Sequence, residues 1–229
     1  MVKKFIKKVT NFRFFKNLRN NQRSKNLAKN SKGQINQNTS SAELICNLIT
    51  SKEINSVLEI GTWNGLGSTT TIYDCLDNVQ NSFHFISIES DKYFYREAKN
   101  NFKGKSMIDI KLGRLFELNE LPEISSIDFQ KHGLIKENVE WFYQDLRRYK
   151  KIKNIYEELP SKFDFILFDG GEFSTFAEFK KLYMKTKYFA LDDINTYKQF
   201  EVLRFINKNS KNFKEFSSSN NLKIFEVLT

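Results

Sequence analysis

The stretch VLEIGTWNGLGSTTTIYDCL, residues 57–76, decides the fold. A short apolar run ends at Gly61, further glycines follow at Gly65 and Gly67, and a helical pattern begins with Ser-Thr-Thr. A short apolar run bounded by glycine is typical of a buried strand. Glycine at the end of such a strand allows a tight turn and lets a ligand approach the backbone. The stretch therefore predicts a strand, a ligand-binding loop and a helix.

The same alternation of strand and helix continues along the chain. Later strands are expected in FHFISIE (83–89), MIDIKLG (107–113), FDFILFDGG (163–171) and KYFALDD (187–193), followed by a closing pair in NFKEFSSS (212–219) and LKIFEVLT (222–229). Strands that alternate with helices at this spacing form a parallel sheet with helices on both faces. We therefore expect an α/β fold with a Rossmann-like, doubly wound, mostly parallel seven-stranded sheet whose last strand is antiparallel.

The distribution of charge divides the chain into two parts. Residues 1–33 hold eleven Lys and Arg and no acid, which leaves 26 basic against 27 acidic residues in the rest of the chain. The net charge of +10 therefore belongs to the N-terminus. Residues 1–39 are expected to form a basic helical extension and linker, and residues 40–229 one domain with an insertion at about 115–160 before the fourth strand.

The extension has a pattern that suits three interpretations. Val2, Phe5, Val9 and Phe12 recur near helical spacing with lysines between them, so a basic amphipathic helix can lie on an anionic membrane surface. Basic charge with interleaved aromatic residues also suits nucleic acid, and a disordered or packed extension is the third interpretation. The near-neutral body makes nucleic acid the less expected partner, and contact through residues 1–33 would be peripheral.

Composition also bounds the cellular context. The chain has no run of 18 apolar residues and no signal-peptide pattern at its start. Cys46 and Cys75 lack CxxC spacing and are expected to be reduced thiols. These features predict a cytoplasmic protein, peripheral at the inner membrane if the extension binds there.

The glycine spacing and a later acid indicate the kind of ligand. The loop is G-x-x-x-G-x-G, whereas a dinucleotide site has G-x-G-x-x-G. The second predicted strand ends at Glu89, where an acid can accept hydrogen bonds from both hydroxyls of a ribose. A nucleoside-containing ligand other than NAD is therefore expected, and another nucleotide remains the alternative.

This acid and glycine pattern, together with the order of elements over residues 40–229, resembles class I S-adenosylmethionine (SAM)-dependent methyltransferases. The resemblance implies that Glu59 and the three glycines hold the methionine end of SAM and that Glu89 holds the ribose. Many relatives have an acid after the third strand, where this chain has Gly113 and Arg114. The expected SAM-binding residues are Glu59, Gly61, Thr62, Trp63, Gly65, Gly67, Ser68, Glu89, Arg114 and Asp169.

A second set of acids follows two later strands. Asp169 and Glu172 follow the fourth strand, and Asp192 and Asp193 follow the fifth. The ends of parallel strands meet at one edge of a sheet, and clustered carboxylates there suit Mg²⁺ or a similar divalent cation. The alternative is that Asp192 or Asp193 caps the next helix.

These acids resemble the metal sites of O-methyltransferases of the catechol and macrocin types and of cephalosporin-hydroxylase-like relatives. Asp169, Asp192 and Asp193 match the metal-binding positions, and methyltransferase-like proteins of bacterial glycan clusters are similar here too. Several relatives have a Lys or His as general base three residues after the first metal acid, where this chain has Glu172. Glu172 and Asp169 are therefore the candidate catalytic residues.

The resulting hypothesis is a metal-assisted O-methyltransferase that acts on a hydroxyl of a sugar, a glycan precursor or another small molecule. The insertion at 115–160 would form much of the acceptor pocket. Two alternatives stay open: a noncatalytic binding or scaffold protein that keeps the cofactor fold, favoured by Glu172 in the place of the usual base, and an RNA methyltransferase that uses the basic extension.

Overall fold

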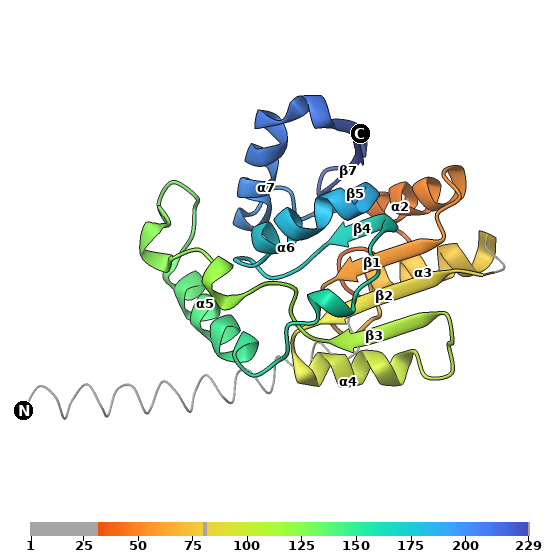
Figure 1. The fold of residues 1–229 in the computed structure, drawn as a ribbon, viewed down its shortest axis with the longest axis horizontal. Coiled ribbons are helices and arrows are strands. Elements are labelled where there is room, and N and C mark those ends of the chain that lie inside the picture. Colours follow the sequence, from red (N-terminus) through yellow and green to blue (C-terminus); the bar gives the residue numbers. More distant parts are fainter. Residues whose placement is uncertain (1–31, 80–81, 229) are drawn as a thin grey trace, which may run out of the picture.

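The computed structural model describes residues 32–79 and 82–228. In these ranges seven strands form one sheet, and helices cover both of its faces (Figure 1). The sheet is mostly parallel with antiparallel strands at one end, which confirms the expected fold class. The amphipathic helix expected near the N-terminus lies outside the described residues.

The strand order is β3-β2-β1-β4-β5-β7-β6. The strands are β1 (Ser56–Ile60), β2 (His84–Glu89), β3 (Ile108–Leu112), β4 (Phe163–Phe168), β5 (Thr186–Asp192), β6 (Phe213–Ser218) and β7 (Leu222–Val227). From β1 the chain builds outward to β2 and β3 on one side, and it later adds β4 and β5 on the other side. Open parallel sheets bind ligands at such a switch point.

The two faces of the sheet carry separate apolar cores. Helices α2 (Ser40–Ser51), α3 (Ser68–Val79) and α4 (Lys92–Asn101) contribute to one core, and α6 (Thr175–Leu182) and α7 (Tyr197–Lys208) contribute to the other. In β1, Val57 belongs to the first core and Leu58 to the second, because successive strand residues point to opposite faces. Burial on both faces explains why the strands read as continuous apolar runs.

The register of the parallel strands aligns the residues at which they end. Ile60 of β1 pairs with Ile88 of β2 and with Phe168 of β4, and Phe168 pairs with Leu191 of β5. The next residue of each strand therefore belongs to one row at the carboxyl edge of the sheet: Glu89, Gly61, Asp169 and Asp192. The expectation that the glycine loop and both acid groups share one edge is thus met.

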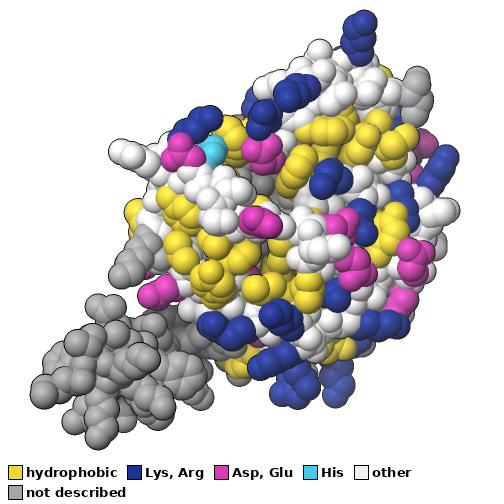
Figure 2. Space-filling view, turned by 60° about the vertical axis from the view of Figure 1, so that its left-hand side comes forward, with side chains coloured by type: hydrophobic (Ala, Val, Ile, Leu, Met, Phe, Trp, Pro, Cys, Tyr) yellow, Lys and Arg dark blue, Asp and Glu magenta, His cyan; other side chains and the backbone are white. Residues whose placement is uncertain are grey.

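The insertion before β4 contains the expected helix, which ends at Tyr149, and about half of its residues are helical. It contains α5 (Lys136–Tyr149) and the short 3-10 helices η1 (Leu118–Glu120), η2 (Ile124–Ser126) and η3 (Tyr156–Glu158), while η4 (Tyr183–Lys185) and η5 (Ser210–Asn212) lie later in the chain. Helix α5 exposes Trp141 and Tyr143, and Figure 2, which turns this side forward, shows hydrophobic side chains gathered among Lys and Arg.

None of the helices in the described part of the chain is long and apolar enough to cross a membrane.

Cys46 and Cys75 form a disulfide, which corrects the expectation of two reduced thiols. The two residues are 29 positions apart in the sequence, so no local motif marks them as a pair. Packing of α2 against α3 brings their Cα atoms to 5.5 Å, a separation typical of disulfides. The pairing therefore depends on helix packing, which the cysteine spacing does not report.

Gly61→Ala is expected to lower the free energy of unfolding by about 3 kcal/mol. A Cβ at this position would collide with the backbone carbonyl group of Asp169, and the φ of +102° is unfavourable for any side chain. Urea denaturation of the wild-type and variant proteins measures the loss.

Gly104→Ala is the matched control for this substitution. Gly104 also has a positive φ, +88°, but a Cβ there would meet nothing within 4 Å. Its expected loss is therefore only the backbone cost of about 1 kcal/mol. Equal losses for the two variants would show that the contact with Asp169 is not what requires glycine at position 61.

Candidate functional site

A cavity of about 590 Å³ opens at the carboxyl edge of the sheet. Its wall comes from the loops after β1 to β5, from residues 33–35 and from the end of α5. The volume is typical of a small-molecule pocket. It brings together most of the predicted site residues: Gly61, Thr62, Trp63, Gly67, Ser68, Glu89, Arg114, Asp169, Asp192 and Asp193. Three predicted residues do not line it: Glu59, Gly65 and Glu172.

The glycine loop is anchored where β1 ends. The backbone N–H groups of Gly61 and Thr62 donate to the carbonyl oxygen of Ile88 in β2, at 2.9 and 3.2 Å. Trp63 follows with a φ of +51°, which is strained for an aromatic residue. Such strain is commonly found at ligand sites, and Trp63 lies in the cavity wall.

The other two glycines of the loop allow close packing in different directions. A Cβ at Gly67 would lie 2.9 Å from the carbonyl oxygen of Lys32, so this glycine lets the segment before α2 cover the loop. A Cβ at Gly65 would lie 2.9 Å from the ring of Phe102, at the end of α4. Gly65 therefore serves helix packing outside the cavity.

Glu59 lies beneath the glycine loop and is fully buried. Its carboxylate accepts hydrogen bonds from the hydroxyls of Ser68 (2.6 Å), Thr69 (2.6 Å) and Ser87 (2.5 Å). Burial raises the pKa of Glu59 to about 7, and the three hydroxyls oppose this rise. The resemblance placed Glu59 at the methionine end of SAM. In the structure its oxygens instead tie β1, β2 and α3 together under the loop.

Glu89 faces the cavity from the end of β2. One carboxylate oxygen accepts from the backbone N–H of Trp63 at 2.6 Å, and the other accepts from Ser90 and Asp91 at 2.7 and 2.6 Å. Burial raises the pKa of Glu89, and these amide contacts oppose the rise. A carboxylate offers about four lone-pair positions, so the side chain keeps capacity for a ligand hydroxyl.

Arg114 contributes to the cavity wall but directs its guanidinium to the backbone of the insertion. Nε donates to the carbonyl oxygen of Tyr149 at 3.3 Å, and Nη1 donates to that of Phe116 at 2.8 Å. These contacts hold the end of α5 beside the end of β3. The insertion thereby supplies Arg148 and Tyr149 to the cavity wall.

The three aspartates after β4 and β5 converge in the cavity wall. Asp169, Asp192 and Asp193 each offer an oxygen within 4.8 Å of the others. Gln199 of α7 fixes the two strand ends, because its amide nitrogen donates to the carbonyl oxygens of Phe168 (3.1 Å) and Asp192 (2.9 Å). Asp193 has a φ of +56°, so this acid cluster is held in a locally strained turn.

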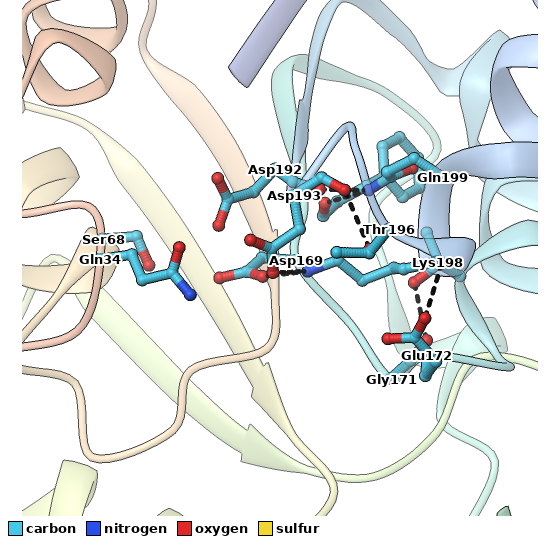
Figure 3. Close-up of polar contacts among 12 residues, drawn as sticks. Gln34, Ser68, Asp169, Gly171, Glu172, Asp192, Asp193, Thr196, Lys198 and Gln199 are labelled. Carbon is cyan, nitrogen blue, oxygen red and sulfur yellow. Dashed lines mark hydrogen bonds and ion pairs between the residues drawn. The ribbon is translucent and has the colours of Figure 1, made fainter. Parts of the chain in front are cut away.

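Lys198 is the main site residue that sequence reasoning missed. Its ammonium donates to Asp169 Oδ1 at 2.6 Å and to Asp193 Oδ2 at 2.9 Å, and the residue is only 6% exposed (Figure 3). Burial lowers the pKa of a lysine, but the charges of Asp169 and Asp193 outweigh burial and raise the pKa of Lys198. The signal in the sequence was a lysine on the first turn of the helix that follows the doubled acid.

The pKa values of Asp192 and Asp193 shift in opposite directions. Burial, followed by the charge of Asp169, raises the pKa of Asp192 to about 7. Burial alone would also raise the pKa of Asp193, but Lys198 and a 3.0 Å hydrogen bond from Asn221 lower it. Asp193 therefore carries its charge at neutral pH, whereas Asp192, with a pKa of about 7, is only partly ionised there.

Glu172 is not part of the acid cluster. Its Oε1 accepts from the backbone N–H of Lys198 at 3.1 Å, at the start of α7 (Figure 3). The side chain lies in a separate, smaller hollow with Phe173 and Tyr197. Glu172 therefore anchors the first turn of α7, and the structure does not bring the expected general base to the cavity.

Glu178 of α6 is a second residue that the sequence did not single out. It lines the cavity and is 5% exposed, and its Oε2 has no hydrogen-bond partner among the described residues. Burial raises the pKa of Glu178 to about 8, so the carboxyl is mostly protonated at neutral pH. Near it, the Tyr149 hydroxyl donates to Ser174 at 3.2 Å. No local motif marks an acid in the middle of a helix.

The segment at residues 33–35 also belongs to the cavity wall. It was expected to be a linker, yet Ile35 is 3% exposed and joins the core on the α2 side of the sheet. Figure 3 shows Gln34 and Ser68 facing the acids. Gln34 Oε1 accepts from Asn221 at 3.1 Å, which links this segment to the acid cluster.

The acid cluster as it stands does not fit the expected divalent cation. Three carboxylates are suitable ligands for Mg²⁺. However, Lys198 already occupies Asp169 Oδ1 and Asp193 Oδ2, and Asn221 occupies Asp193 Oδ1. A cation bonded to these oxygens would compete with a buried ammonium for the same space. The predicted metal site thus stays a prediction that requires Lys198 to move.

Solved structures similar to this one are methyltransferases. A protein from Staphylococcus aureus described provisionally as a caffeoyl-CoA O-methyltransferase has a TM-score of 0.56 at 15% identity, covering 95% of this chain and 99% of its own. The O-methyltransferase from Bacillus cereus in complex with SAH has a TM-score of 0.57 at 13% identity, covering 91% and 88%. The SAH-bound Podospora anserina methyltransferase PaMTH1 has a TM-score of 0.51 at 10% identity, covering 81% and 77%.

This chain has the class I SAM-dependent methyltransferase fold. No protein-family model matches the sequence, and no curated protein is similar to it. At these identities the likeness establishes the fold, and the function has to be argued from the site.

Glu178→Gln is expected to change how stability depends on pH. An unfolded Glu ionises near 4.5, whereas the folded carboxyl keeps its proton up to about 8. Its stabilising contribution is therefore full below pH 4.5 and is lost as the pH rises through about 8. Relative to Glu178→Gln, the wild type should lose roughly 1 kcal/mol of unfolding free energy per unit between about pH 5 and 8.

Urea denaturation of both proteins across this pH range measures the difference. Comparison with the variant removes the contributions of the other buried acids, because both proteins contain them. Parallel curves of stability against pH would contradict the raised pKa of Glu178.

Proposed function

We propose that the protein is a SAM-dependent O-methyltransferase acting on a hydroxyl of a small molecule, with a sugar or glycan precursor as the favoured acceptor. One observation carries the proposal. A single cavity is lined by Glu89 and the glycine loop and also by Asp169 and Asp193. Groups that suit a nucleoside and groups that suit a polar acceptor therefore face the same space. The fold, shared with O-methyltransferases, supports this proposal.

The residues on the β2 side of the cavity fit SAM. Glu89 would accept a hydrogen bond from a ribose hydroxyl, and three backbone amides hold its carboxylate in place for this contact. Gly61 and Thr62 would lie along the methionine end, beside Asp169 in the row of strand ends. Glu178 of α6 and Tyr149 at the end of α5 add buried polar groups to the cavity wall.

Asp169 is positioned to act on the acceptor. When bound, SAM supplies a methyl group on a positively charged sulfur and leaves as a neutral thioether. Asp169 would accept the hydrogen bond of the acceptor hydroxyl and take its proton as the oxygen attacks. Lys198 fixes the orientation of Asp169 through a 2.6 Å ion pair. Because the leaving group is good, holding the oxygen in line with the methyl group would supply most of the acceleration.

A more specific version of this proposal includes a divalent metal, through which the three carboxylates would bind the acceptor. The donor set supports it, and the position of Lys198 opposes it. The mechanism above therefore relies on no metal. The proposed membrane contact and the RNA alternative rest on the extension, most of which lies outside the described residues.

The position of Glu172 favours one other function, a noncatalytic binding protein. The residue in the place of the family's usual base lies outside the cavity and caps α7. On this alternative the cavity would bind SAM without any transfer. Asp169, which does face the cavity, is the reason to favour the enzyme.

Calorimetric titration should show SAM binding at roughly micromolar affinity. Glu89→Gln is expected to weaken binding at least about tenfold, because an amide cannot replace both the ribose contact and the contacts to three backbone N–H groups. Glu172→Gln is the matched control and should leave the affinity unchanged. Absence of SAM binding in the wild type would overturn the proposal and favour another nucleotide.

Methyl transfer to a panel of hydroxylated sugars, followed by mass spectrometry, tests the enzyme itself. Asp169→Asn should lower the rate by about 100-fold or more while SAM still binds, since proton transfer is lost. Glu172→Gln should remain active. SAM binding without a methylated product from any sugar or glycan extract would support the noncatalytic alternative.

A further inference from the structure

The side chain of Lys198 is buried in the acid cluster rather than at the surface. Its ammonium lies 2.6 Å from Asp169 Oδ1 and 2.9 Å from Asp193 Oδ2, and the side chain is 5% exposed. A buried charge is tolerated only when it is paired and hydrogen-bonded. The ammonium and the two carboxylates therefore require one another in this position.

We propose that Lys198 is the resident cation of this site and takes the place of a divalent metal, so that the acid cluster binds no Mg²⁺ or Mn²⁺ while the lysine is present. Its role is then a positioning one: it holds Asp169 and Asp193 toward the cavity with a fixed charge. The inference concerns cation binding alone and does not depend on whether the protein transfers a methyl group.

The backbone that carries Lys198 is anchored on both sides. Its own N–H donates to Glu172 Oε1 at 3.1 Å. The next residue, Gln199, donates to the carbonyl oxygens at the ends of β4 and β5. The lysine therefore enters the cluster from a fixed point. Leaving the cluster would separate the ammonium from both acids.

The ligand atoms are also largely engaged. Asp193 Oδ2 accepts from Lys198, and Asp193 Oδ1 accepts from Asn221 at 3.0 Å. The same Asn221 nitrogen lies 3.4 Å from Asp192 Oδ1. Mg²⁺ requires near-ideal octahedral geometry with short bonds to oxygen. A cation bonded to Asp169 Oδ1 or to the oxygens of Asp193 would have to displace the lysine or break these hydrogen bonds.

The role of Glu172 follows from the same arrangement. The resemblance placed a catalytic lysine or histidine three residues after the first acid, where Glu172 stands. In the structure the cation comes from α7 instead, and Glu172 holds the backbone from which that lysine projects. The motif position after the first acid therefore carries no lysine or histidine, and α7 supplies the positive charge instead.

Titration of the EDTA-treated full chain with Mn²⁺, followed by calorimetry and by the electron paramagnetic resonance of free Mn²⁺, tests the proposal. The wild type should show no saturable binding. Lys198→Met removes the ammonium but keeps a side chain of similar length, and it should bind Mn²⁺ at least about tenfold more tightly. Adding Asp193→Asn to that variant should abolish the gain.

Lys181→Met is the matched control, because Lys181 also pairs with an acid, Glu120, at 3.0 Å, but outside the cluster. It should bind no Mn²⁺. Saturable binding to the wild type that is lost in Asp169→Asn would overturn the proposal, since the metal would then share the cluster with the lysine.

A folded Lys198→Met protein that gains no binding would also overturn it, because the lysine would not be what excludes the metal. If this variant does not fold, Lys198→Gln and the wild-type titration decide by the same criteria. If the proposal about Lys198 is overturned, the result expected from the SAM titration does not change. Each of the two proposals can therefore be rejected without the other.

Discussion

The close approach of the ends of β1 and β4 is the constraint on which the site depends. At Gly61 a Cβ would take the space of the backbone carbonyl group of Asp169, so only glycine lets these strand ends meet. The contact brings the glycine loop against the acid cluster, although the two are far apart in the sequence. Both then line a single cavity at the switch point of the sheet.

Buried charge sets the second requirement. The acids after β4 and β5 lie close enough to repel one another, and Lys198 offsets that repulsion from within the cluster. The side-chain amide of Gln199 holds the strand ends, and the carboxylate of Glu172 holds the start of α7. This polar network therefore engages the carboxylate of Glu172 in a structural contact, whereas Asp169 lines the cavity.

Glu59 and Glu89, near the ends of the neighbouring strands β1 and β2, differ in role because their surroundings differ. Glu59 lies one residue before the end of β1 and points beneath the loop, where three hydroxyls satisfy it. Glu89 is the last residue of β2 and faces the cavity, held by backbone amides. In the register of the sheet Glu59 lies beside Ser87, two residues before Glu89, so both acids are on the same face of the sheet but at different depths: Glu59 lies under the loop, whereas Glu89 reaches the cavity.

Sequence patterns alone were enough to predict a mostly parallel sheet and the row of strand ends, because apolar runs, glycines and strand-helix alternation are local properties. From these, Gly61, Glu89, Asp169 and Asp192 could be placed at one edge. Only the tertiary structure decided that Glu172 turns to α7, that Lys198 enters the acid cluster and that Cys46 meets Cys75. These outcomes depend on distances between separate segments and on side-chain direction, which helix packing sets and residue spacing does not encode.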